Sequence, residues 1–168
     1  MRHIIGILLQ NESGALLRVA GLFSNRGYNI ESLSVATTDD ATVSRITLVT
    51  TGSEAAIQQI VAQLNKLIDV LAVDDMTSGD HLERELVLVK LRVAAGRREA
   101  LARQVAQAGG RVLNEAPDST IVELCASEAE ATRFMREAAQ FGPLLEVVRS
   151  GTLGISRRAG RLGLDEAG

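Results

Sequence analysis

Residues 8–35, LLQNESGALLRVAGLFSNRGYNIESLSV, predict a strand, a helix and a second strand joined by short turns. The first strand ends at Leu9, and the polar residues 10–14 form the turn after it. The helix has apolar residues at the i, i+3, i+4 and i+7 spacing of an element that packs on a sheet. These residues are Leu16, Val19, Ala20 and Phe23. Gly27 can supply the left-handed residue that ends the helix.

The start of this helix is a candidate binding site for a small anionic group. The backbone N–H groups of Gly14, Ala15 and Leu16 have no partner within the helix, and they lie at the positive end of its dipole. Asn11 follows the first strand and Asn29 begins the second, so we expect both to lie at the same end of the sheet. Because an amide both donates and accepts hydrogen bonds, the pair suits the ammonium and carboxylate of a free amino acid.

Each asparagine taken singly has a simpler explanation. Asn is common in turns, and Ser13 or Asn11 can cap the helix with its side chain. The binding hypothesis therefore depends on the pair and on the exposed helix start between them.

The first 75 residues predict four strands and two helices. Residues 3–9 are apolar on both faces, so this strand is expected at the centre of its sheet or against another chain. Residues 28–37, 43–51 and 68–75 are strand-like, and Ser53 can cap a second helix. The resulting order, β-α-β-β-α-β, is the split βαβ pattern of a ferredoxin-like sandwich.

The second half of the sequence repeats this order of elements. Strands are expected at 85–93, 111–116, 119–125 and 144–149, and helices at 97–108 and after the capping box 127–130. The sequence therefore predicts an α+β protein with two consecutive ferredoxin-like domains, 1–77 and 83–155. Residues 156–168 are Gly- and Arg-rich without periodicity, which predicts a mobile tail.

Composition narrows the class of protein. The net charge is −3 and aromatic residues are 2% of the chain. Neither value suits a nucleic-acid binder, and the strand that would stack RNA bases carries Arg45, Thr47 and Val49 instead of aromatics.

No run is long enough to span a membrane, and no signal peptide is recognisable. The single cysteine, Cys125, fits a reducing cytoplasm and is expected to be buried in a strand.

No catalytic or metal site is predicted. The two histidines, His3 and His81, are far apart in the sequence and have no clustered cysteine. The sequence also lacks a nucleophile elbow, a Walker loop and a dinucleotide-binding glycine motif.

The run NESGALLRVAGLFSNRGYNIESLSVATTDD, followed by SRITLV, closely resembles the regulatory small subunit of acetolactate synthase, also called acetohydroxyacid synthase. The similarity continues more loosely through ERELVLVK and VVRSG. It implies an N-terminal ACT domain and a C-terminal ferredoxin-like domain. It also implies a non-catalytic subunit that activates the catalytic large subunit and confers feedback inhibition by valine. Thiamine diphosphate, FAD and magnesium would then belong to the catalytic partner, and this chain would hold no cofactor.

The resemblance also implies an effector site. Carried over to this sequence, that site consists of Asn11, Gly14, Ala15 and Asn29, with apolar neighbours Leu9, Leu16, Ile30 and Val35. ACT domains of this kind pair edge to edge, so Asn11 of one chain and Asn29 of its mate would hold one ligand in a homodimer. Two departures from the family are visible: the turn 37–41 lacks prolines, and the C-terminal tail is longer and richer in arginine.

We therefore interpret the sequence as a cytoplasmic regulatory subunit that senses a branched-chain amino acid. The alternative is a stand-alone ACT-type sensor acting on transcription or another enzyme, which would need a helix-turn-helix or a basic face that neither half shows. An enzyme is the third possibility. The sequence does not distinguish valine from leucine or isoleucine.

Overall fold

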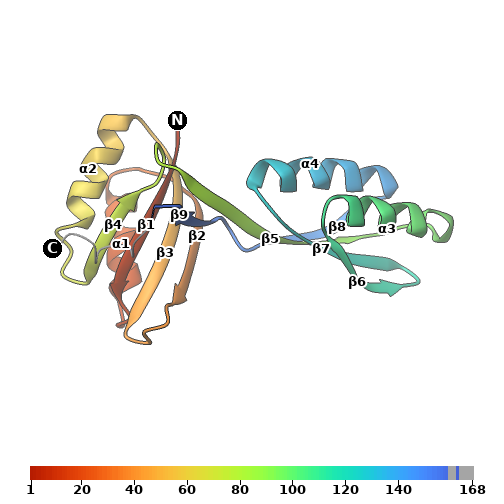
Figure 1. The fold of residues 1–168 in the computed structure, drawn as a ribbon, viewed down its shortest axis with the longest axis horizontal. Coiled ribbons are helices and arrows are strands. Elements are labelled where there is room, and N and C mark those ends of the chain that lie inside the picture. The colour runs from red at the N-terminus through yellow and green to blue at the C-terminus, as the bar shows by residue number, and fades with distance from the viewer. Residues whose placement is uncertain (159–161, 163–168) are drawn as a thin grey trace. The chain divides into compact units, whose positions relative to one another are not determined.

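The computed structural model describes residues 1–158 and 162, and the chain divides into two units. Unit 1 contains residues 1–82 together with the segment from Thr152 onward, and unit 2 contains residues 83–151. The chain passes from unit 1 into unit 2 within strand β5 (His81–Leu91) and returns after Gly151. Figure 1 shows the elements of both units.

Unit 1 has a four-stranded antiparallel sheet and two helices. Its elements are β1 (Arg2–Gln10), α1 (Ala15–Asn25), β2 (Ile30–Thr37), β3 (Val43–Thr51), α2 (Glu54–Leu64) and β4 (Val70–Asp75). The strand order is β2-β3-β1-β4, so β1 is central and β2 lies at an edge. The ferredoxin-like prediction for this half is confirmed, and so is the central position of the first strand.

The main core of unit 1 lies between the sheet and its helices. Ile5, Ile7 and Leu9 alternate along β1 and all point into this core. Helix α1 buries Ala15, Val19 and Phe23. Leu16 was expected in the buried apolar stripe of this helix, but it is 40% exposed. The buried stripe instead begins at Ala15, the first residue of the helix.

The second face of the same sheet carries a small apolar cluster, and residues of the same chain cover it. Ile4, Val49 and Met76 form a small buried cluster on that face. Strand β9 (Leu153–Ser156) contacts this face and also pairs with β5. In Figure 1 it is the blue strand beside β1 and β3.

The position of β9 corrects two expectations about the C-terminal region. The domain was predicted as 83–155, but the compact unit ends at Gly151, because residues 152–158 belong to unit 1. The tail predicted as mobile from residue 156 is ordered at its start, where the N–H of Arg157 donates to the carbonyl of Asp80. Residues 159–161 and 163–168 of that predicted tail lie outside the described residues.

Unit 2 repeats the architecture. After β5 come α3 (Arg98–Gln107), β6 (Arg111–Ala116), β7 (Ser119–Ala126), α4 (Glu128–Ala138) and β8 (Leu144–Arg149), with short 3-10 turns at Ala95–Arg97 and Ala139–Phe141. The strand order is β6-β7-β5-β8, and both helices lie on one face of the sheet. The predicted capping box is present, with Ser127 and Glu130 each bonding the other's backbone N–H.

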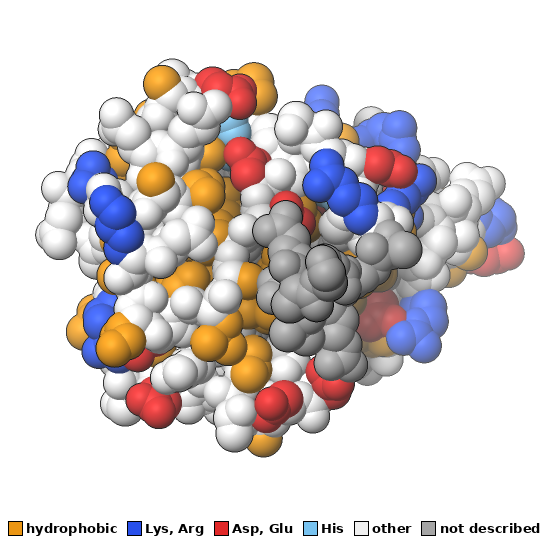
Figure 2. Space-filling view, turned by 60° about the vertical axis from the view of Figure 1, so that its left-hand side comes forward, with side chains coloured by type: hydrophobic (Ala, Val, Ile, Leu, Met, Phe, Trp, Pro, Cys, Tyr) orange, Lys and Arg blue, Asp and Glu red, His pale blue; other side chains and the backbone are white. Residues whose placement is uncertain are grey.

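Charged side chains are mixed on the surface view. In Figure 2, Lys and Arg side chains stand in separate small groups, some of them next to Asp or Glu, and they form no continuous basic patch on the face shown. None of the helices among the described residues is both long enough and apolar enough to cross a membrane.

Cys125 is exposed, which contradicts the expectation of a buried thiol. Its neighbours Leu124 and Ala126 on β7 face the helices of unit 2, so alternation places Cys125 on the opposite face.

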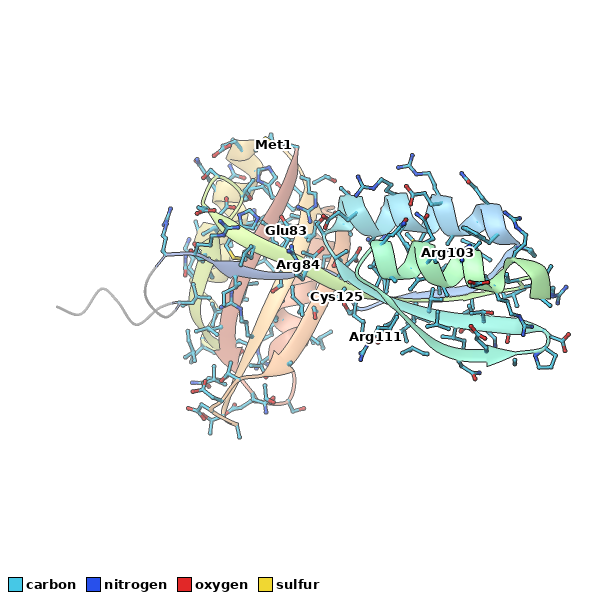
Figure 3. The ribbon with its side chains drawn as sticks, turned by 45° about the vertical axis from the view of Figure 1, so that its right-hand side comes forward. Met1, Glu83, Arg84, Arg103, Arg111 and Cys125 are labelled. Carbon is cyan, nitrogen blue, oxygen red and sulfur yellow. The ribbon has the colours of Figure 1, made fainter. Side chains whose placement is uncertain are left out.

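The same face of the unit 2 sheet carries an ion pair. Figure 3 shows Arg111 of β6 pointing away from helices α3 and α4. Its guanidinium pairs with Glu123, which lies on the same face of β7 as Cys125.

Candidate effector site

Helix α1 begins at a glycine in the left-handed conformation. Gly14 is the N-cap residue with φ 85° and ψ −10°, and no side chain caps the helix. Other residues are strained in this region, so the turn requires glycine. The expected cap from Ser13 or Asn11 is wrong, since the Asn11 side chain donates to the carbonyl of Ala41 at 3.0 Å.

The open amides at this helix start include Gly14 and Leu16 of the expected set but not Ala15. The N–H of Ala15 donates to the carbonyl of Glu12 at 3.2 Å, and the N–H of Arg18 donates to the carbonyl of Gly14 at 3.0 Å. Among the described residues the N–H of Gly14 has no hydrogen-bond partner, and neither have the N–H groups of Leu16 and Leu17, which lie between Ala15 and Arg18. These open amides can donate to an anionic group at the positive end of the helix.

An ion pair lies beside the helix start. A Cβ atom at Gly14 would be 3.1 Å from Nη1 of Arg18, whose Nε donates to Asp69. This hydrogen bond is the main cause that lowers the pKa of Asp69 and raises that of Arg18. The pair is neutral as a whole and joins the first turn of α1 to the residue that precedes β4.

The sequence analysis missed this pair. The sequence did contain an indication that Arg18 has an acidic partner. Arg18 is a basic residue in the N-terminal part of a helix, where the helix dipole favours acidic residues. Asp69 is only 5% exposed, and a carboxylate this buried needs a partner.

The two asparagines lie at opposite ends of the sheet in one chain. Asn29 precedes Ile30, which pairs with Thr50 near the end of β3. Asn11 follows Gln10, which pairs with Val43 at the start of β3. At about 3.3 Å per residue, the seven positions from 43 to 50 on β3 correspond to roughly 23 Å. The expectation that both residues surround one helix start within a chain is therefore wrong. The physical reason is that β1 and β2 are both antiparallel to β3, so α1 returns the chain to the opposite end of the sheet.

The apolar residues predicted for the site differ in exposure. Leu9 and Ala15 are each 2% exposed and belong to the core, so they support the site without offering a side chain to a ligand. Leu16 is 40% and Val35 41% exposed, and Ile30 is half-buried. Within one chain the predicted residues therefore fall into two separate groups: Asn11 with the helix start, and Asn29 with Ile30 at the beginning of the edge strand.

No metal centre is apparent in the described part of the chain, where no three His, Cys, Asp or Glu side chains gather closely enough to hold an ion. The predictions that the chain holds no cofactor and no metal remain predictions.

Comparisons with known proteins agree with this architecture. Residues 5–72 match the family model described as an AHAS small subunit-like ACT domain, and residues 84–158 match the model described as small subunit of acetolactate synthase. The acetolactate synthase isozyme 3 small subunit of Escherichia coli K12 is 45% identical over 157 residues, which covers 94% of this chain and 96% of that protein. This chain belongs to the acetolactate synthase small-subunit family.

Further members of the acetolactate synthase small-subunit family are similar over the same length. The small subunit of Haemophilus influenzae is 43% identical and covers 94% of this chain and 96% of its own. The crystal structure of the small subunit from Thermotoga maritima superposes with a TM-score of 0.84 at 26% identity and covers 94% of this chain and 98% of that one. The resemblance inferred from the N-terminal sequence is thereby confirmed, together with two ferredoxin-like domains.

Proposed function

We propose that this chain is the regulatory small subunit of an acetolactate synthase, that it activates the catalytic large subunit, and that it confers feedback inhibition by valine or a related branched-chain amino acid. Membership of the acetolactate synthase small-subunit family over almost the whole chain is the observation that carries the proposal. The open helix start in unit 1 supports the proposed effector site, because it offers amide donors beside exposed aliphatic side chains.

The separation of the two asparagines favours a site shared by two chains. Strand β2 lies at the edge of its sheet and can pair with another strand. Antiparallel pairing of two β2 strands would reverse one chain relative to the other. Asn29 of one protomer would then lie at the end where Asn11 and the α1 start of its partner lie. The dimer would contain two such sites, related by its two-fold axis.

The ligand chemistry follows from the groups that this arrangement would bring together. The N–H groups of Leu16 and Leu17 suit a carboxylate, and the two amide side chains suit an ammonium group. The exposed parts of Leu16 and Val35 can contact a short aliphatic side chain. Inhibition requires linkage, so the effector must bind one arrangement of the dimer more tightly than the arrangement that activates the large subunit.

The first prediction concerns assembly. We expect a homodimer through β2, and we expect Val35→Lys to weaken it, because the substitution would place a positive charge from each protomer within the strand pair. Sedimentation at micromolar concentration should show a dimer for the wild type and a larger monomer fraction for the variant. Ile68→Lys is the matched control, since Ile68 is 88% exposed and precedes the strand at the opposite edge. A wild-type monomer with and without valine would contradict the shared site.

The second prediction concerns activity. Purified alone, the protein should not convert pyruvate to acetolactate in the presence of thiamine diphosphate, FAD and magnesium. Added to the catalytic subunit, it should raise the rate and make that rate sensitive to valine. Turnover that follows this chain through purification, with no large subunit present, would contradict the regulatory assignment.

A further inference from the structure

Residues 152–158 cross the second face of the unit 1 sheet from its edge strand inward. At one end, the N–H of Thr152 donates to Oγ of Ser32 on β2 at 2.9 Å. Thr152 itself is only 3% exposed, so this contact is shielded from water. The segment therefore makes a direct and protected contact with the edge strand.

The middle of the segment is bonded to β3. The N–H of Gly154 donates to Oγ1 of Thr47 at 3.3 Å, and its carbonyl accepts from Nη2 of Arg45 at 3.0 Å. Thr47 is 3% exposed and therefore depends on partners within the protein.

The segment fits against β1 because residue 154 has no side chain. A Cβ atom there would lie 2.7 Å from Cδ1 of Ile4 and 2.9 Å from Cε of Met76, which is closer than carbon atoms approach. Ile4 is 1% and Met76 2% exposed, so the segment closes an apolar strip that would otherwise face water. At the far end, the N–H of Arg157 donates to the carbonyl of Asp80 at 3.0 Å.

Strand β2 is an edge strand whose start the contact from Thr152 can stabilise. It pairs on one side only, with β3, and its register shifts between Ile30 and Ser32. A bulge of this kind leaves one residue unpaired and loosens the ladder locally. Ser32 is the first residue after the bulge, three positions from Asn29, and it accepts the hydrogen bond from Thr152.

We propose that residues 152–158 act as a strap that holds the bulged start of β2 in place, so that amino-acid binding by unit 1 depends on this C-terminal segment. The proposal rests on the proposed function, which places Asn29 and the β2 edge at the effector site. It gives the strap a regulatory consequence: release of the segment would loosen β2 and weaken effector binding while the main core of unit 1 stays intact.

Two variants of the full chain test the strap. Gly154→Val forces the segment away from Ile4 and Met76, whereas Ser32→Ala removes its bond to β2 without adding bulk. Hydrogen exchange should become faster in residues 152–158 and 30–37 of Gly154→Val, and in residues 30–37 of Ser32→Ala. Calorimetric affinity for valine should fall about tenfold for Gly154→Val and about twofold to tenfold for Ser32→Ala, the range of one neutral hydrogen bond.

Control variants distinguish the loss of the strap contacts from a general loss of stability. Ile155→Ala alters a side chain that is 61% exposed, so exchange and affinity should stay at wild-type values. Met76→Ala makes room for the added side chain and should restore part of the affinity lost in Gly154→Val. If Gly154→Val does not fold, Ser32→Ala alone decides the question.

The possible results of these experiments distinguish a failure of the strap proposal from a failure of the proposed function. Unchanged exchange in residues 30–37 after release of the strap would overturn the inference, and so would faster exchange with unchanged valine affinity. A wild-type protein that binds no branched-chain amino acid would reject the proposed function, while exchange in the same samples would still show whether the strap holds β2.

Discussion

Gly14→Asp should abolish detectable valine binding while the protein remains a folded dimer. The added carboxylate would stand where the carboxylate of the effector is expected, beside the open amides of Leu16 and Leu17. Two like charges a few ångströms apart near a surface repel by about 4 kcal/mol, which is roughly a thousandfold in affinity. Arg18 offsets only part of this repulsion, because its guanidinium already pairs with Asp69.

The control for Gly14→Asp must carry the same backbone strain. Gly109→Asp provides it, since Gly109 has φ 79° and ends α3 in unit 2 with open space around a new Cβ atom. Calorimetry should show wild-type valine binding for Gly109→Asp and little or none for Gly14→Asp. A folded Gly14→Asp protein that binds valine normally would show that the carboxylate lies elsewhere.

Asn11→Ala and Asn29→Ala should each weaken valine binding by about 1.5–3 kcal/mol, because each removes a hydrogen bond to a charged group. The corresponding loss of affinity is about tenfold to 150-fold. Neither residue is part of the core, so dimerisation and activation of the large subunit should persist, and the holoenzyme should become insensitive to valine.

The asparagine variants also need a control. Asn114→Ala changes an exposed residue of β6 in unit 2 and should leave valine affinity unchanged. Asn11→Ala additionally loses the bond to Ala41, so its sedimentation and thermal unfolding should be compared with those of the wild type. A variant that loses valine binding only because it no longer dimerises would not support a direct role for that asparagine.

The sequence was sufficient for features that depend on local patterns. Alternation in β1 predicted its central position, since Ile5 and Ile7 fill one face while Ile4 lies on the other. The caps at Ser53 and Ser127 were predictable because a capping residue and its partner lie within three positions.

Features that depend on contacts distant in the sequence were not predicted. Asn11 and Asn29 flank the same helix, but the helix separates them in space instead of bringing them together. Strand β9 is short, and its two apolar side chains, Leu153 and Ile155, are exposed, so its alternation does not reveal the face that packs on the sheet. Its position depends on the fit of Gly154 against Ile4 and Met76, which lie far from it in the sequence.

The residues near the candidate site could be predicted from the sequence, but their hydrogen bonds and exposure could not. Gly14 was correctly placed at the helix start, whereas the N–H of Ala15 proved to be bonded and that of Leu17, which was not predicted, proved to be open. Which amides remain open depends on the turn before the helix, where the N–H of Ala15 bonds to Glu12. The exposure of Leu16 follows from the same helix start.

The central claim is that each effector site is built from two chains, and a mixed dimer tests it most directly. Asn11→Ala and Asn29→Ala chains, coexpressed with different tags and purified as the mixed dimer, would place both substitutions in one site and leave the other site intact. Calorimetry should then show one valine site of wild-type affinity per mixed dimer, although neither parent homodimer has any. A mixed dimer that binds valine as weakly as its parents would contradict the shared site.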